Sequence, residues 1–140
     1  MRLSSKNFSL AIDSQGGWHA AWFTLGYNRK GVFYAHSFDQ GAHFSDPMPV
    51  GSPDDQAGRP NLLAIGDTIY LAWKQFDGDQ SVVRLMVSHD RGDHFGPPQV
   101  IGSTKDASDH PILIADGTKS YLSWLTANEG YRLIPLEAAE

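Results

Sequence analysis

The sequence predicts an all-β fold made of three tandem copies of one four-stranded unit. Two observations carry this prediction: a recurrence along the chain and an alternation of apolar side chains. Trp22, Trp73 and Trp124 lie 51 residues apart, a spacing typical of repeat architectures. The same spacing separates Ser37 from Ser88, Gly41 from Gly92, Phe44 from Phe95, and Pro60 from Pro111.

The alternation identifies the repeated elements as strands. In segment 69–73, Ile69, Leu71 and Trp73 point one way and the residues between them point the other. Both faces are largely apolar, so this strand must be covered on both sides. No segment combines a helical period with caps, and only the tail 136–140 favours a helix.

Strand-sized segments follow one another along the chain. The first copy holds 8–12, 18–24, 32–37 and 48–50, the second 61–65, 68–75, 82–88 and 98–101, and the third 112–115, 120–126 and 131–136. A four-stranded unit of about 40–50 residues that is apolar on both faces is typical of a β-propeller blade. An all-β sandwich is the alternative, but a sandwich has no reason to repeat.

We therefore expect residues 1–140 to form a single partial β-propeller domain. Blade one is expected at about 8–51 and blade two at about 61–102. Blade three, at about 112–136, lacks its outer strand. Because closed propellers have about four to eight blades, the chain is expected to be part of a ring of about six. The remainder of a larger propeller, or a second copy of the chain, would complete it.

Composition excludes several function classes. The net charge of −5 disfavours a nucleic-acid partner. No apolar run approaches the roughly 20 residues of a membrane-spanning helix, and segment 1–10 is not a signal peptide. The absence of cysteine excludes disulfides and thiolate metal sites, and the spacing of the six histidines matches no dedicated metal site. We expect no cofactor, and the sequence leaves the compartment open.

One constellation of residues recurs between the third and fourth strands of the first two copies. An Asp there can accept hydrogen bonds from backbone amides in its own turn, Gly supplies a positive φ, and Ser adds a hydroxyl. The residues are Ser37, Asp39, Gly41 and Phe44 in the first copy, and Ser88, Asp90, Gly92 and Phe95 in the second.

These turns resemble the Asp-box, or bacterial neuraminidase repeat, whose pattern is Ser-x-Asp-x-Gly-x-Thr-Trp. The two copies share two departures from it, with His43 and His94 in place of Thr and Phe in place of Trp. The resemblance, over about 8–136, is to the sialidase superfamily, whose typical members are six-bladed propellers that cleave terminal sialic acids. It implies a secreted or periplasmic parent protein, and a structural rather than catalytic role for Asp39 and Asp90.

The resemblance also implies that a substrate pocket lies at the opposite end of the blades from these turns. The loops expected there supply Arg29, Arg59, Asp106, Asp109 and His110 as candidates. Sialidases clamp the sugar carboxylate with three arginines, a use suited to a planar bidentate donor. Arg59 fits such a clamp, although pairing with Asp54 or Asp55 in its own loop is the alternative. His110 occupies the equivalent place in the next repeat, which breaks the clamp there.

Two further pairs could carry glycosidase chemistry. Glu129 and Tyr131 are two residues apart and could share a face as base and nucleophile. Asp106 and Asp109 could act as two working carboxylates, although a solvated acidic loop explains them equally. The sequence leaves the question of enzyme activity open. It predicts a sialidase-like segment of a glycan-hydrolysing or glycan-binding protein, inactive as an isolated chain, and the alternative is a non-enzymatic module that binds a protein or polysaccharide.

Overall fold

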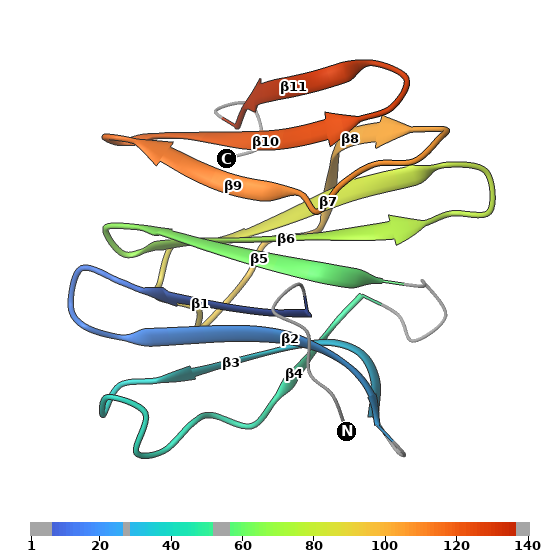
Figure 1. Ribbon diagram of the computed structural model, residues 1–140. Coiled ribbons are helices and arrows are strands. Elements are labelled where there is room, and N and C mark those ends of the chain that lie inside the picture. Colours follow the sequence, from blue (N-terminus) through green and yellow to red (C-terminus); the bar gives the residue numbers. More distant parts are fainter. Residues whose placement is uncertain (1–6, 27–28, 52–56, 137–140) are drawn as a thin grey trace.

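The computed structural model describes residues 7–26, 29–51 and 57–136 as three antiparallel β-sheets stacked face to face (Figure 1). The all-β prediction is confirmed, and the sheets resemble blades of a partial propeller. The first sheet contains β1 (Phe8–Ile12), β2 (Trp18–Gly26), β3 (Arg29–Ser37) and β4 (Met48–Val50). The second contains β5 (Gly58–Ile65), β6 (Thr68–Phe76), β7 (Ser81–Ser88) and β8 (Gln99–Thr104). The third contains β9 (Ile112–Asp116), β10 (Lys119–Thr126) and β11 (Gly130–Pro135).

Each sheet is a meander whose strands pair in chain order. We call the sheets blades one, two and three. The first strands of the blades lie next to one another, because β5 contacts both β1 and β9. The tail 136–140 was the only segment found to favour a helix, and its residues 137–140 lie outside the described residues. In the described part of the chain, no helix is long and apolar enough to cross a membrane.

Two apolar layers hold the stack together. The first lies between blades one and two and is centred on Trp73, Leu71 and Ile69, all fully buried. The second lies between blades two and three and is centred on Trp124 and Leu122. In both layers the repeated Trp points toward the preceding blade. The strand positions that alternate with this Trp therefore mark which face of each blade packs on the preceding blade.

A repeated polar contact accompanies each layer. The backbone amide of Leu62 donates to Ser9 Oγ at 2.9 Å, and the amide of Leu113 donates to Asn61 Oδ1 at 2.7 Å. In each case the acceptor belongs to the first strand of the preceding blade. These bonds fix the stagger between neighbouring inner strands, because a side chain can reach only one backbone amide of the adjacent strand.

The connections fall at two ends of the stack. The turns β1–β2, β3–β4, β5–β6 and β7–β8 gather at one end, which we call the turn end (Figure 1). The connections β6–β7, β8–β9 and β10–β11 gather at the other end, which we call the loop end. The inner strands β5 and β9 begin at the loop end, so their first residues define its centre.

Candidate functional site at the loop end

Arg59 has an unusual backbone at the start of β5. Its φ is +51°, a left-handed conformation that few residues other than glycine adopt. A β-bulge between Gly58 and Asn61 accompanies it, and the next residue, Pro60, is fully buried. The bulge shifts the pairing by one residue and re-aims the Arg59 side chain. Residues held in such conformations concentrate at functional sites.

Lys74 is the second cation of this end. It pairs with Gly58 across β5 and β6, and its half-buried Nζ donates to the Ser108 carbonyl at 2.9 Å. Burial lowers the pKa of Lys74, the positive charge of Arg59 lowers it further, and the negative charge of Asp109 opposes both. Arg59, Lys74 and Asp109 therefore share one electrostatic environment.

The β8–β9 connection supplies the acidic side of the site. Its backbone is pinned to blade three, since Trp124 Nε1 donates to the Asp109 carbonyl at 3.0 Å and the Asp109 amide donates to the Leu125 carbonyl at 2.9 Å. The Asp109 carboxylate accepts the His110 amide at 2.8 Å. The side chain of His110 is half-buried beside it. The repeated Trp thus both fills the core and positions a loop.

The other sequence-predicted residues lie apart from this group or outside the description. Asp106 is exposed in the β8–β9 connection. Arg29 begins β3, but its side chain lies outside the described residues, as do Asp54 and Asp55. The alternative pairing of Arg59 with those two aspartates therefore stays a prediction.

Glu129 and Tyr131 have different partners. The Glu129 carboxylate faces Arg132 at 4.0 Å, whereas the Tyr131 hydroxyl hydrogen-bonds to Ser123 Oγ at 2.8 Å. The two side chains therefore make separate contacts, and a base–nucleophile pair between them stays a prediction.

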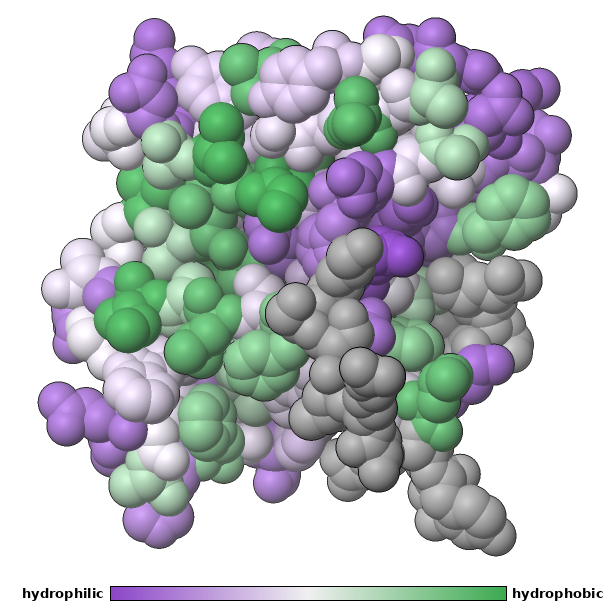
Figure 2. Space-filling model, in the orientation of Figure 1, coloured by the Kyte–Doolittle hydropathy of each residue, from purple (hydrophilic) through white to green (hydrophobic). Residues whose placement is uncertain are grey.

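The surface reflects this division. Figure 2 shows hydrophilic residues gathered where β5 and β9 begin, and hydrophobic residues over the far halves of β1, β5 and β9.

Sequence reasoning missed Lys74. A charged residue directly after a buried Trp, in a strand that is otherwise apolar on both faces, is the signal that could have found it.

The Ser–Asp turns at the opposite end

The β3–β4 and β7–β8 connections form two matching turns at the turn end, which we call the Ser–Asp turns. In the first, Ser37 Oγ donates to Asp39 Oδ1 at 2.7 Å and accepts the Gly41 amide at 2.9 Å. The Asp39 carboxylate also accepts the His43 amide at 2.9 Å and contacts the His43 ring at 2.8 Å. Hydrogen bonds from Ser37 and then from His43 hold the pKa of Asp39 well below its ordinary value.

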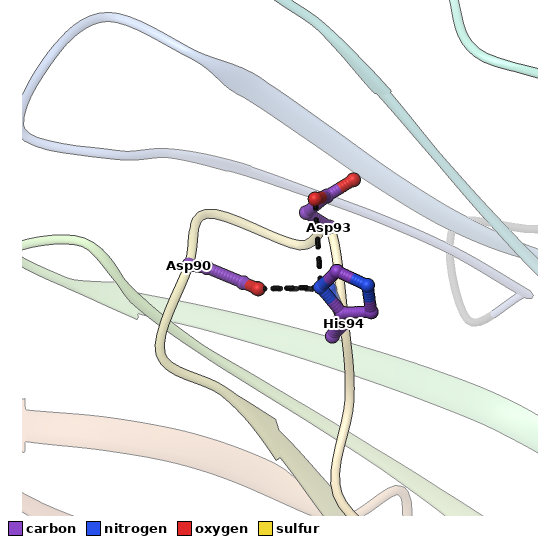
Figure 3. A group of neighbouring side chains, drawn as sticks. All are labelled: Asp90, Asp93 and His94. Carbon is purple, nitrogen blue, oxygen red and sulfur yellow. Dashed lines mark hydrogen bonds and ion pairs between the residues drawn. The ribbon is translucent and has the colours of Figure 1, made fainter.

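The second turn repeats this network around Ser88, Asp90, Gly92 and His94, with distances of 2.7–2.8 Å for the matching contacts. Figure 3 shows Asp90, Asp93 and His94 converging, with the His94 ring between the two carboxylates. All three side chains are exposed, and their ligand atoms lie within 4.8 Å of one another. The hydrogen bonds of Asp90 are the ones that close the turn. The closeness of Asp90, Asp93 and His94 therefore follows from the geometry of the turn.

A buried polar network joins the second turn to blade one. Asp13 Oδ2 contacts His19 Nε2 at 2.8 Å and accepts Arg91 Nε at 3.0 Å. Since a carboxylate only accepts, Nε2 of His19 donates to Asp13, and Nδ1 of the same ring hydrogen-bonds to the Tyr34 hydroxyl at 2.6 Å. Burial raises the pKa of Tyr34 and keeps its hydroxyl protonated. A Cβ at Gly92 would overlap this hydroxyl, so only glycine fits there.

Sequence reasoning missed this network, although one signal pointed to it. The first repeat is one residue longer than the others between its Leu and its Trp, and Asp13 lies in that longer turn. The Asp13 and His19 side chains have no exposed surface, so the network joins blades and does not form an open site.

Comparison with known proteins

Solved structures of larger proteins match nearly the whole chain. The GH43 protein BlXynB from Bacillus licheniformis covers 94% of it, with a TM-score of 0.62 and 16% identity. The family 117 glycoside hydrolase Zg3597 from Zobellia galactanivorans covers 95%, with a TM-score of 0.54 and 16% identity. An exo-1,5-alpha-L-arabinanase from a bovine ruminal metagenomic library covers 96%, with a TM-score of 0.54 and 15% identity. The chain is a β-propeller segment.

The segment accounts for only part of each matched propeller. It spans 28% of the BlXynB chain, 54% of Zg3597 and 55% of the arabinanase. These matches are distant structural resemblances to glycoside hydrolase propellers, which are five-bladed. A parent ring of about six blades, expected from the sialidase resemblance, therefore stays a prediction. No protein-family model matches the sequence, and the comparison with curated proteins finds no match.

Proposed function

We propose that the chain is a sialidase-like, Asp-box propeller segment that binds an acidic glycan at the loop end and does not hydrolyse it alone. The observation that carries the proposal is the pair of cations formed by Arg59, at the start of β5, and Lys74, near the end of β6. The distant resemblance to glycoside hydrolase propellers supports a carbohydrate as the ligand class. The network of the Ser–Asp turns supports an Asp-box with a structural role.

The chemistry of the loop end suits a carboxylate. A guanidinium presents a planar fork that can bind both carboxylate oxygens. An ammonium has three N–H donors, of which the Ser108 carbonyl takes one. Both cations are half-buried, so their attraction for an anion is screened less than that of exposed lysines. Asp109 and the half-buried His110 offer acceptor and donor groups for sugar hydroxyls at the edge of the same site.

Isothermal titration with sialyllactose, and with lactose as the neutral counterpart, tests the proposal. We expect sialyllactose to bind more tightly than lactose, and Arg59→Ala or Lys74→Met to weaken its binding about tenfold or more, the value of a hydrogen bond to a charged group. Lys105→Met is the matched control, since Lys105 is an exposed cation whose carboxylate partner, Asp79, is 3.8 Å away. Equal binding of both sugars, or unchanged binding by the two variants, would overturn the proposal.

The absence of turnover is tested separately with a fluorogenic sialoside. Because Glu129 and Tyr131 have separate partners, we expect no release of sialic acid by the purified chain. Release that Arg59→Ala abolishes, in a preparation free of contaminating enzyme, would show that the segment is a hydrolase.

A further inference from the structure

An apolar groove lies on the outward face of blade one. Its main lining residues are Phe8, Leu10, Trp18, Ala20, Trp22 and Phe44. Phe8 and Leu10 are each about half exposed, and Trp22 stacks on Phe33 at 6.3 Å between ring centres. Among the described residues, no strand covers this face.

The internal repeat shows what this face is built to contact. Leu10 corresponds to Leu62 and Leu113, which are only 6% and 5% exposed, whereas Leu10 is 49% exposed. Trp22 corresponds to Trp73 and Trp124, which are buried against the preceding blade. Each apolar layer is formed by the Trp-bearing face of one blade, its leading half, and the opposite face of the preceding blade, its trailing half. The groove is therefore the leading half of such a layer, and no preceding blade is present in the described chain to supply the trailing half.

The trailing half of such a layer is exposed on blade three. By register, Tyr131 and Leu133 occupy the positions of Val83 and Leu85 in blade two, which pack against blade three. Tyr131 and Leu133 are 61% and 50% exposed. On the same face, Ile112, Ile114 and Leu125 are also exposed.

We propose that two copies of the chain associate head to tail, with the groove of blade one in each copy packed on the outward face of blade three in the other. The two faces are the halves of an interface that the chain already forms twice, between blades one and two and between blades two and three. A closed pair buries both faces of both copies, whereas any open arrangement leaves one groove in water. The proposal does not depend on glycan binding.

The occupant is a second copy because the chain itself carries both complementary faces. An isologous contact of groove against groove is the other arrangement of two copies, and variants of blade three distinguish it.

Light scattering after size exclusion tests the proposal on the purified 140-residue chain. We expect a molar mass of twice the 15.4 kDa of one chain, constant over a wide range of concentration. A monomer at high concentration would overturn the proposal, and so would a mass that grows steadily with concentration, because that would indicate an open filament.

Two variants locate the interface. Leu10→Glu and Leu133→Glu should each reduce the mass to that of one chain, because a head-to-tail layer needs both faces. Phe76→Glu is the matched control, since Phe76 is an exposed apolar residue at the end of β6 and its variant should stay paired. All three sites are exposed, and circular dichroism should show that the blades remain folded. A pair that Leu10→Glu separates and Leu133→Glu leaves intact would overturn the head-to-tail arrangement.

Discussion

At the scale of single residues, the Ser–Asp turns show how a short polar motif closes a connection without an apolar core. One carboxylate, in Asp39 or Asp90, accepts a hydroxyl, a backbone amide and an imidazole contact. The serine hydroxyl accepts the glycine amide in return. At the seventh position, where the Asp-box pattern has Thr, each turn has a His that supplies both the backbone amide and a ring contact.

Replacing the first carboxylate tests this role. Asp39→Ala removes the acceptor of Ser37 Oγ and of the His43 amide, and we expect the melting temperature to fall by about 3–6 °C. Ligand binding at the loop end should be unchanged. Asp46→Ala, at an exposed neighbour, should leave the melting temperature within about 1 °C of the parent. Equal melting of Asp39→Ala and the parent would contradict the assigned role.

The pH dependence of stability also arises at single residues. Burial alone would raise the pKa of Asp13, but hydrogen bonds from Arg91, His19 and two backbone amides outweigh it and hold the pKa below the ordinary value of 3.8. A carboxyl with a lowered folded pKa adds stability that is complete above its ordinary pKa and is lost as pH falls through the folded value. We therefore expect the free energy of unfolding to decrease as pH falls below about 4.

Urea unfolding between about pH 6 and pH 2.5 measures this decrease. Asp13→Asn cannot lose a carboxylate charge on acidification, so its unfolding free energy should depend less steeply on pH than that of the parent. A residual slope should remain, because the pKa values of Asp39 and Asp90 are also lowered. Parallel pH profiles for Asp13→Asn and the parent would rule out this origin.

At the scale of elements, the second Ser–Asp turn fastens blade two to blade one. Arg91 reaches Asp13 at 3.0 Å and lies over the Phe38 ring at 4.3 Å. Its backbone amide donates to the Asp67 carbonyl, and Phe95 packs edge-on against Tyr34. One connection therefore touches two turns of blade one and the inner hairpin of its own blade.

Removing the guanidinium tests this fastening. Arg91→Met keeps much of the aliphatic bulk but leaves the buried Asp13 carboxylate short of one charged donor. We expect the free energy of unfolding to fall by about 2 kcal/mol. Lys105→Met breaks only an exposed ion pair and should cost less than about 0.5 kcal/mol. Similar losses in the two variants, measured by urea unfolding, would show that Arg91 is no more than a surface cation.

At the scale of the whole molecule, each inner-strand junction uses one side-chain acceptor. Ser9 and Asn61 accept the amides of Leu62 and Leu113. In the proposed pair, the equivalent acceptor position on blade three is Ile112, which faces the Leu10 amide of the other copy and has no acceptor to offer. The junction between copies is thus weaker than the two junctions within a chain.

Supplying that acceptor should strengthen the pair. Ile112→Asn places an amide oxygen where Asn61 has one, and the dissociation constant measured by analytical ultracentrifugation should fall at least fivefold, as expected for a net hydrogen bond. Ile112→Ala, which shortens the side chain without adding an acceptor, is the control and should not tighten the pair. An unchanged or larger dissociation constant for Ile112→Asn would contradict the proposed register between copies.

The sequence by itself determined the local and periodic features. The 51-residue recurrence and the two-residue alternation predicted eleven strands in three sheets, because burial on both faces of a strand leaves a pattern in its residue types. Ser37 and Asp39 could be placed in one turn because turn chemistry acts over a few neighbouring residues. Both features depend on residues that are close together in the sequence, so they can be predicted from the sequence without the fold.

Only the tertiary structure decided which distant groups meet. Asp13 and Arg91 are 78 residues apart, and no residue pattern near either one in the sequence indicates that they pair. The positive φ of Arg59 and the placement of Lys74 beside the β8–β9 connection depend on a bulge and on blade stacking. Such contacts arise from the stagger between sheets, which is set by packing side chains across a layer, and no periodicity in the sequence encodes that stagger.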